Sequence, residues 1–541
     1  MMIKQILWCA MTILLAVHTL AARDINVSNV QLHLSSTSSE SYYATVSCDI
    51  SWKNSWRDDV NWDAAWVFVK YQTNEGIWKH ATLSTTPSDF VLPDGFMLTP
   101  SPDGKGIFIF RAEQGKGDVH LKGVHLRWLY RLDGMVVQPN SAVRVFALEM
   151  VYVPEGAFQL GDGTLFNVTG HFTDPFQTVS RTNPERKVMT FRGITPAPSR
   201  PEFRESLVLT SSGVKDVSKE ETREISRPAR IESEREILFG NSTADNFGNS
   251  QGKGMLLSDD VPRAYPSVAI SEHFPKGFAA FYCMKYEISQ GEYAAFLNTL
   301  TDIQAANLAP EGSAEHRYTI RAENFKFTAA HPERACNYLD WGRGAAFLDW
   351  AALRPMTELE YEKAARGTRT AAAGEYAWGK ESPIPVEDII IDEHGREHIL
   401  PEHANCNFGM KTFSDGSKGA LPCGFAEQGN LGRKERGASY YGIAELSGNL
   451  WEQCITVGDP QGRRYSALHG DGELDYDGSA NVERWATGIN GMGYRGGSWS
   501  NQSFRLRISD RQVAVGGAVA NTTVTAAALG FRGVRTASPI K

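Results

Sequence analysis

The sequence lacks an excess of basic residues. Its 55 Lys and Arg residues stand against 63 Asp and Glu residues, which gives a formal net charge of -8 and a pI near 6.0. Proteins that bind nucleic acid through its phosphates carry a basic patch or stripe, and no dense basic run occurs here. The composition therefore predicts no nucleic-acid partner.

Long apolar runs are also absent, apart from one at the N-terminus. Lys4 precedes a nearly continuous apolar stretch at Ile6–Leu20, and the small residues Ala21 and Ala22 follow it. This order is typical of a cleaved secretory signal, and the stretch is too short for a stable membrane anchor. The sequence thus predicts a signal peptide at residues 1–22 and a secreted or periplasmic protein with no membrane span after its removal.

Cysteine is scarce, with 7 residues in the whole chain. Cys9 lies in the predicted signal peptide. Secretion would permit disulfides among the other six, but their spacing does not select a pairing. None of them lies in the C-terminal stretch Tyr494–Arg535, which carries a Gly-Gly-Ser-Trp motif and several arginines. The six are Cys48, Cys283, Cys336, Cys406, Cys423 and Cys454.

Residues 23–148 have the pattern of short strands. Runs rich in β-branched and aromatic residues recur, for example at Trp66–Tyr71 and Val143–Met150, and turn sequences such as Pro102-Asp103-Gly104 separate them. Several short strands with turns between them predict an all-β sandwich domain. The tract Trp52–Trp66 contains four tryptophans. They could stack on sugars, but burial at one end of the sandwich core is the favoured interpretation.

Local signals in the C-terminal half predict helices. Ser289 and Glu292 have the spacing of a capping box, as do Thr357 and Glu360. Asp340 is a candidate N-cap for a helix at 341–353. The clustered Glu358, Glu360 and Glu362 could suggest acid–base chemistry, but a capped surface helix explains them without it.

Several segments of the C-terminal half, taken in order, resemble the sulfatase-modifying-factor family, whose best-known member is the formylglycine-generating enzyme. The resemblance implies an α+β, C-type-lectin-like domain over residues 149–541, with a long insertion at about 163–275 that is rich in Pro, Ser, Glu and Arg. The segments are Met150–Gly161, Phe281–Ser289, Arg354–Gly367, Tyr376–Gly379, Ser439–Cys454, Tyr494–Trp499 and Leu529–Arg535.

The resemblance also says which residues the family's chemistry requires. The formylglycine-generating enzyme oxidises a cysteine of its client sulfatase with copper held by two thiolates, the ligands that Cu(I) prefers. The family places both cysteines between the Gly-Gly-Ser motif and the next arginine-rich segment. Here that interval is Ser500–Arg507, where Asn501 and Ser503 lie nearest the expected positions. Neither replaces a thiolate, so we expect no copper and no formylglycine-generating activity. A substitute thiol pair drawn from Cys406, Cys423 or Cys454 is less favoured than buried thiols or disulfides.

By resemblance, five residues would line the client-binding groove and could hold a peptide or a glycan. They are Trp499, Asn501, Ser503, Arg505 and Arg511.

The family also binds structural calcium through oxygen ligands, which suit Ca²⁺. The matching positions are Asn405 and Asp415 for one site, and Asn449 and Glu452 for another. In the alternative interpretation, Asn449 caps a turn and Glu452 pairs with an arginine.

Two other metal patterns are not favoured. The acidic loop Asp471–Gly478 lacks the ligand order of an EF-hand. His394 and His398 have the spacing of an inverted zinc-protease motif, but Gly395 and Pro401 oppose the helix which that motif needs.

Three functions follow from these observations. The favoured one is an exported, non-catalytic member of the family that binds a peptide or glycan. The alternatives are an oxidoreductase of the formylglycine-generating type with altered chemistry and a structural component of a cell-envelope assembly.

Overall fold

The computed structural model describes most of the chain outside the predicted signal peptide and the long insertion. The described residues are 25–34, 43–162, 172–173, 178–180, 222–224, 228–239, 256–257, 268–324, 326–380, 382–393, 395–427, 432–514 and 524–538.

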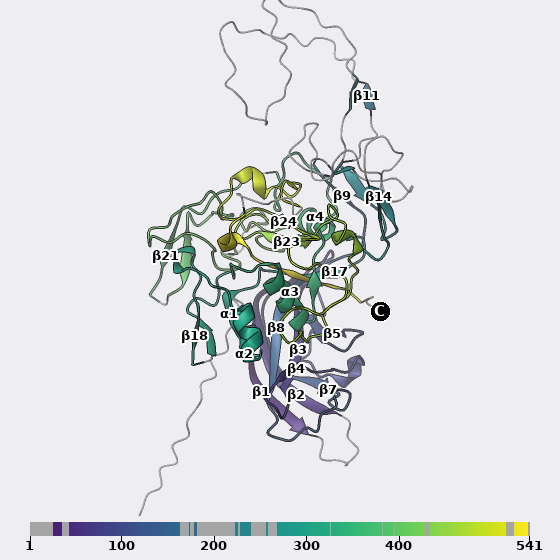
Figure 1. Cartoon of the computed structure of the whole chain (residues 1–541), viewed down its shortest axis with the longest axis vertical. Coiled ribbons are helices and arrows are strands. Elements are labelled where there is room, and N and C mark those ends of the chain that lie inside the picture. The colour runs from purple at the N-terminus through teal and green to yellow at the C-terminus, as the bar shows by residue number, and fades with distance from the viewer. Residues whose placement is uncertain are drawn as a thin grey trace, which may run out of the picture.

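The centre of the molecule is an antiparallel sheet of eight strands to which both halves of the chain contribute (Figure 1). Strand β8 (Val143–Val153) pairs with β3 (Asp63–Gln72) on one side and with β17 (Phe281–Met284) on the other. The order is β20-β25-β17-β8-β3-β6-β5, and β4 pairs with β3. The remaining strands are β4 (Trp78–His80), β5 (Phe96–Pro100), β6 (Ile107–Arg111), β20 (Arg354–Pro355) and β25 (Gly533–Thr536).

A second sheet faces the N-terminal part of the first. It has the order β1-β2-β7, from β1 (Asn26–Leu34), β2 (Ala44–Arg57) and β7 (Gly115–Trp128). Alternate residues of β2 point inward, so Val46 packs in one apolar cluster with Val67 and Ile109 of the large sheet. The predicted boundary at 148 falls inside β8, because this strand continues to Val153. The division into two domains stays a prediction.

The tryptophans of the 52–66 tract are mostly core residues. Trp52 and Trp66 are fully buried and Trp62 is nearly so. Their indole N–H groups bond to Asp63, Ala351 and Tyr282, respectively, at 2.9, 2.9 and 3.4 Å. Burial was the favoured interpretation, and these rings are not available to stack on a sugar.

Four α-helices occur in the described part of the chain. They are α1 (Gln290–Leu297), α2 (Asp302–Leu308), α3 (Trp341–Trp350) and α4 (Glu358–Arg366). The predicted capping boxes at Ser289 and Thr357 are both formed, and Asp340 accepts the amide of Arg343 at 2.9 Å. None of these helices has the length and apolar character needed to cross a membrane.

The prediction that α4 is a surface helix is wrong. Every residue from Glu358 to Arg366 is buried. The helix is polar because its three carboxylates pair with arginines inside the protein: Glu358 with Arg495 and Arg511, Glu360 with Arg354, and Glu362 with Arg495 and Arg366. The three glutamates form ion pairs in the protein interior, whereas the sequence indicated a structural role at the surface.

Short strand pairs complete the described fold. They are β18 (Ile320–Glu323) with β19 (Lys326–Ala329), β21 (Asp388–Ile391) with β22 (Glu397–Leu400), β23 (Glu452–Ile455) with β24 (Met492–Arg495), β9 (Phe158–Leu160) with β13 (Ala229–Ile231), β14 (Ile237–Phe239) with β16 (Val268–Ile270), β10 (Phe172–Thr173) with β15 (Leu256–Leu257), and β11 (Thr178–Ser180) with β12 (Thr222–Glu224). Residues 163–171, 174–177, 181–221, 225–227, 240–255 and 258–267 of the predicted insertion, like the predicted signal peptide, lie outside the described residues.

Candidate functional site

The segment that would carry the family's cysteines is a compact turn after strand β24. Gly496 and Gly497 have φ values of 80° and 69°, which favour glycine. A Cβ on Gly496 would lie 2.6 Å from the Leu446 carbonyl oxygen. These glycines reverse the chain into a turn closed by Asn501, whose Oδ1 accepts the Ser498 amide at 2.9 Å and the Ser498 hydroxyl at 2.7 Å.

Trp499 is part of the core. Its indole N–H donates to the Ala527 carbonyl at 3.1 Å, and its backbone amide donates to the Asn449 carbonyl at 2.8 Å. On the other side of the turn, the amides of Gly409 and Met410 donate to the carbonyls of Asn501 and Trp499 at 2.8 and 2.7 Å. The predicted groove residues Trp499 and Asn501 therefore hold two loops together and are themselves buried.

Arg511 does not face an open groove. It is 0% exposed, and its guanidinium donates two hydrogen bonds to Glu358, at 2.6 and 2.8 Å. Burial alone would raise the pKa of Glu358, but the charges of Arg511 and Arg495 outweigh it and hold that pKa below its usual value. Arg505 is also largely buried, 3.7 Å from Asp510. The prediction that Arg511 contacts a ligand directly conflicts with this placement.

Ser503 is the predicted groove residue closest to the surface. It is half-buried and begins a short 3₁₀ helix, Ser503–Leu506. Phe504 in that helix is 38% exposed, and Met410 in the adjoining loop is 56% exposed. Met410 also has a φ of 56°, which is unusual for a residue with a side chain. Sequence reasoning missed these two apolar groups because nothing in the local pattern links 410 with 504.

The thiols of the described chain are buried and unpaired with one another. All six cysteines are free. Burial raises the pKa of Cys48 and Cys283 to about 12, and it raises the pKa of Cys336, Cys406, Cys423 and Cys454 well above the ordinary thiol value. A protonated, buried thiol is a poor nucleophile and a poor metal ligand. Absence of copper and of a substitute thiolate pair stays a prediction.

Comparison with known proteins relates the C-terminal half of the chain to a known family. Residues 270–537 match the family described as "Sulfatase-modifying factor enzyme 1-like domain". This domain belongs to the sulfatase-modifying-factor family. A segment of 130 residues is 30% identical to the formylglycine-generating enzyme of Thermomonospora curvata. It covers 23% of this chain and 33% of that enzyme, so the chain aligns with about a third of the relative's length. The predicted opening motif, Met150–Gly161, lies outside the family match.

In this sulfatase-modifying-factor domain, the first pair of calcium candidates is engaged with protein groups. Asn405 is buried, and its Oδ1 accepts the amide of Ile384 at 2.8 Å. Asp415 is exposed, accepts the Ser417 amide at 2.8 Å, and lies 3.6 Å from the Arg317 guanidinium.

The second pair is buried and hydrogen-bonded. Asn449 has a φ of 61°, and its Oδ1 accepts the amide of Leu421 at 2.9 Å while its Nδ2 donates to Glu287 at 2.7 Å. Glu452 Oε1 accepts the Arg532 Nε at 2.8 Å. The Glu452–Arg532 contact corresponds to the alternative interpretation of an arginine pair, whereas the Asn449 side chain bonds to Leu421 and Glu287, which are distant in the chain. Calcium binding at these four residues stays a prediction.

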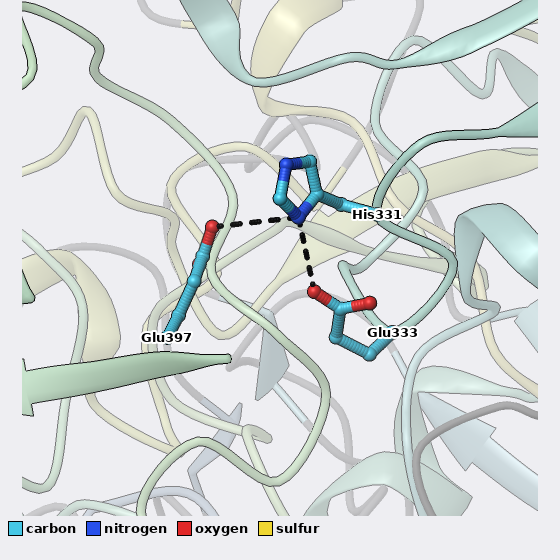
Figure 2. A group of neighbouring side chains, drawn as sticks. All are labelled: His331, Glu333 and Glu397. Carbon is cyan, nitrogen blue, oxygen red and sulfur yellow. Dashed lines mark hydrogen bonds and ion pairs between the residues drawn. The ribbon is translucent and has the colours of Figure 1, made fainter. Parts of the chain in front are cut away.

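A histidine and two glutamates come together at a different place (Figure 2). The Nδ1 atom of His331 lies 3.3 Å from Glu333 Oε1 and 4.0 Å from Glu397 Oε1. These are metal-ligand types, and sequence reasoning missed the group because Glu397 is distant in the chain. However, Arg334 Nε donates to Glu397 Oε1 at 2.9 Å, and Arg317 donates to Glu397 Oε2.

Two guanidinium charges on one carboxylate repel a cation brought to the same oxygen. The donor set at His331 therefore suits an ion-pair network better than a metal centre. The ion pairs join two separate segments, because Glu397 lies in β22 and Arg317 and Arg334 lie in the 313–335 region. The network fastens the β21–β22 hairpin to the domain.

The His394–His398 pattern does not lie on a helix. His394 is outside the described residues, and His398 lies in strand β22 with its Nε2 3.1 Å from Asp392. The acidic loop at 471–478 is likewise held by protein groups, because Lys70, Gln304 and Asn307 donate to its carbonyls at 2.7–2.9 Å.

Proposed function

We propose that this chain is an exported sulfatase-modifying-factor-like protein that binds a peptide client without oxidising it. One observation carries the proposal. The interval Ser500–Arg507 contains no cysteine, and the cysteines elsewhere in the described chain are buried, protonated thiols. Copper-dependent oxidation of a client cysteine needs two accessible thiolates.

A binding role is supported by the surface beside that interval. The two loops that carry Met410 and Phe504 are fixed by backbone hydrogen bonds and by the buried ring of Trp499. The proposal takes Met410 and Phe504, which these fixed loops hold exposed, as the contact site for the peptide. A peptide is favoured over a glycan because the tryptophans at 52, 62 and 66, which could have stacked on sugars, are core residues.

Three finer statements belong to the same proposal. We propose that the family domain has a C-type-lectin-like arrangement and that a β-sandwich precedes it, which the two facing N-terminal sheets support. We propose secretion or transport to the periplasm from the predicted signal at 1–22. Structural calcium is a separate proposal. It would be abandoned if calcium left the thermal unfolding of the metal-stripped protein unchanged.

The first experiment separates catalysis from binding. The purified mature protein is incubated under air, with and without copper, with a peptide that contains the Cys-x-Pro-x-Arg sequence of the family's clients. Mass spectrometry follows the peptide cysteine, and a pull-down measures the peptide retained. We expect retention without conversion. Formation of an aldehyde would overturn the proposal and favour an oxidoreductase with altered chemistry.

A matched pair of variants locates the binding surface. Phe504→Ser removes an exposed ring beside the Ser498–Asn501 turn, and Leu468→Ser removes an exposed side chain from another loop. We expect only the first to weaken peptide retention. Equal retention by both variants would remove this surface from the proposal. Absence of retention by the unmodified protein would favour a structural role in an assembly.

A further inference from the structure

Two arginines share one aromatic ring near the end of helix α4. The Cζ atoms of Arg369 and Arg433 lie 5.1 and 5.6 Å from the ring centroid of Tyr440. Tyr440 is fixed in place, because its amide donates to the Ala365 carbonyl at 3.0 Å and its ring fills the space beside Gly367. A Cβ on Gly367 would lie 2.0 Å from that ring. The ring therefore acts as a rigid platform for two cations.

Two hydrogen bonds to backbone carbonyls fix the guanidinium of Arg433 and leave one of its nitrogens without an acceptor. Its Nη2 donates to the Ala377 carbonyl at 2.6 Å and its Nε donates to the Ala438 carbonyl at 3.2 Å. Its Nη1 is buried and has no hydrogen-bond acceptor in the described structure. Burial, followed by the charge of Arg369, lowers the pKa of Arg433 to about 10. The nearby charge of Arg369 and the buried Nη1 donor of Arg433 without an acceptor both cost free energy. A bound anion would offset that cost.

The protein itself supplies no carboxylate for this pair among the described residues. Arg369 is exposed and makes no ion pair there. Glu375 is the nearby acid that influences Arg433, but it is already bonded to the Arg366 guanidinium and to the amide of Ala372. The negative end of the α4 dipole favours a cation at the C-terminus of the helix, but Arg366, the last residue of the helix, already supplies that cation.

We propose that Arg369 and Arg433, with Tyr440 as their platform, bind a small oxyanion of the carboxylate, phosphate or sulfate type. The forked donors of a guanidinium match the oxygens of such groups and form charge-assisted hydrogen bonds to them. This site goes beyond the proposed peptide contact and does not depend on it, since its test contains no peptide.

The test uses the full mature protein and inorganic anions. Thermal unfolding and isothermal titration calorimetry are measured with sulfate, phosphate or acetate, each balanced with sodium chloride to constant ionic strength. We expect stabilisation above that given by chloride, because a ligand that binds the folded state raises its stability. The order of the three anions identifies the preferred chemistry.

Variants decide whether the arginine pair is responsible. Arg369→Gln, at an exposed position, should weaken anion binding roughly tenfold through loss of a charge-assisted bond. Arg433→Lys keeps the charge but loses the fork, and should also weaken it. Arg464→Gln, which removes another exposed arginine, is the control and should bind as the unmodified protein does. No anion effect beyond chloride, equal binding by Arg369→Gln, or an equal loss in Arg464→Gln would each overturn the proposal.

Discussion

Replacing Glu358 by Gln should be among the most destabilising single changes in this chain. The carboxylate accepts two hydrogen bonds from Arg511, at 2.6 and 2.8 Å, and one from Arg495 at 3.0 Å. It also accepts the Thr456 hydroxyl and the Val457 amide, both at 2.9 Å. An amide keeps the shape, but it removes the charge and turns a donor toward the guanidinium groups.

The size of the effect follows from the burial of the partners. Arg495 and Arg511 are both 0% exposed, so neither can turn to water when its anion is lost. Removing one partner of a buried ion pair costs about 3–5 kcal/mol of the free energy of unfolding. Arg495 keeps its bond to Glu362 at 2.6 Å, whereas Arg511 loses both of its charge-assisted hydrogen bonds to Glu358.

Urea denaturation of the full chain, followed by tryptophan fluorescence, would measure this loss. Glu483→Gln is the control, because Glu483 and Arg484 form an exposed pair whose removal should change the free energy of unfolding by about 0–1 kcal/mol. The folded-state pKa of Glu358 is lowered, so its stabilisation is complete above the unfolded pKa of about 4.3 and is lost as pH falls below it. The difference between the variant and the unmodified protein should therefore shrink in acid. A loss under about 1 kcal/mol at neutral pH would refute the reasoning.

Three further results are expected. Glu397→Gln should loosen the β21–β22 hairpin from Arg317 and Arg334, so amide hydrogen exchange at 388–400 should become faster while exchange in β8 stays unchanged. Burial raises the pKa of Glu292 to about 7, so the unmodified protein should lose stability as pH rises from about 4.3 towards 7, and Glu292→Gln, which keeps the capping box, should not show this part of the pH dependence. The native protein should react with a thiol reagent far more slowly than the urea-unfolded protein, because its six described cysteines are buried; rapid labelling under native conditions would contradict their placement.

Local features of this fold were readable from the sequence. The capping boxes at Ser289 and Thr357 formed as predicted because each depends on residues three apart, and the predicted runs Trp66–Tyr71 and Val143–Met150 lie within β3 and β8. The position of the Ser500–Arg507 interval also followed from a short motif. Such signals survive because neighbouring residues in the chain remain neighbours in space.

What the sequence did not reveal depends on distant partners. Helix α4 looks like a surface helix in isolation, but two of its three glutamates pair with Arg495 or Arg511, which lie more than a hundred residues away. The same applies to the loop of Met410, which bonds to the Trp499–Asn501 turn, and to the approach of Arg369 and Arg433 to the ring of Tyr440. In each case the contact joins segments that are distant in the chain, so no local sequence pattern predicts it.

The continuous sheet affects how this protein can be divided or recombined. Because β17 pairs with β8, a fragment that starts at residue 270 would expose the edge of β17 and the apolar face beneath it, which invites aggregation. The N-terminal region is therefore not a cassette that could be exchanged for another module at a flexible joint. A viable chimera would have to bring its own strand to cover β17, and an evolutionary gain of the N-terminal region would have had to preserve that pairing.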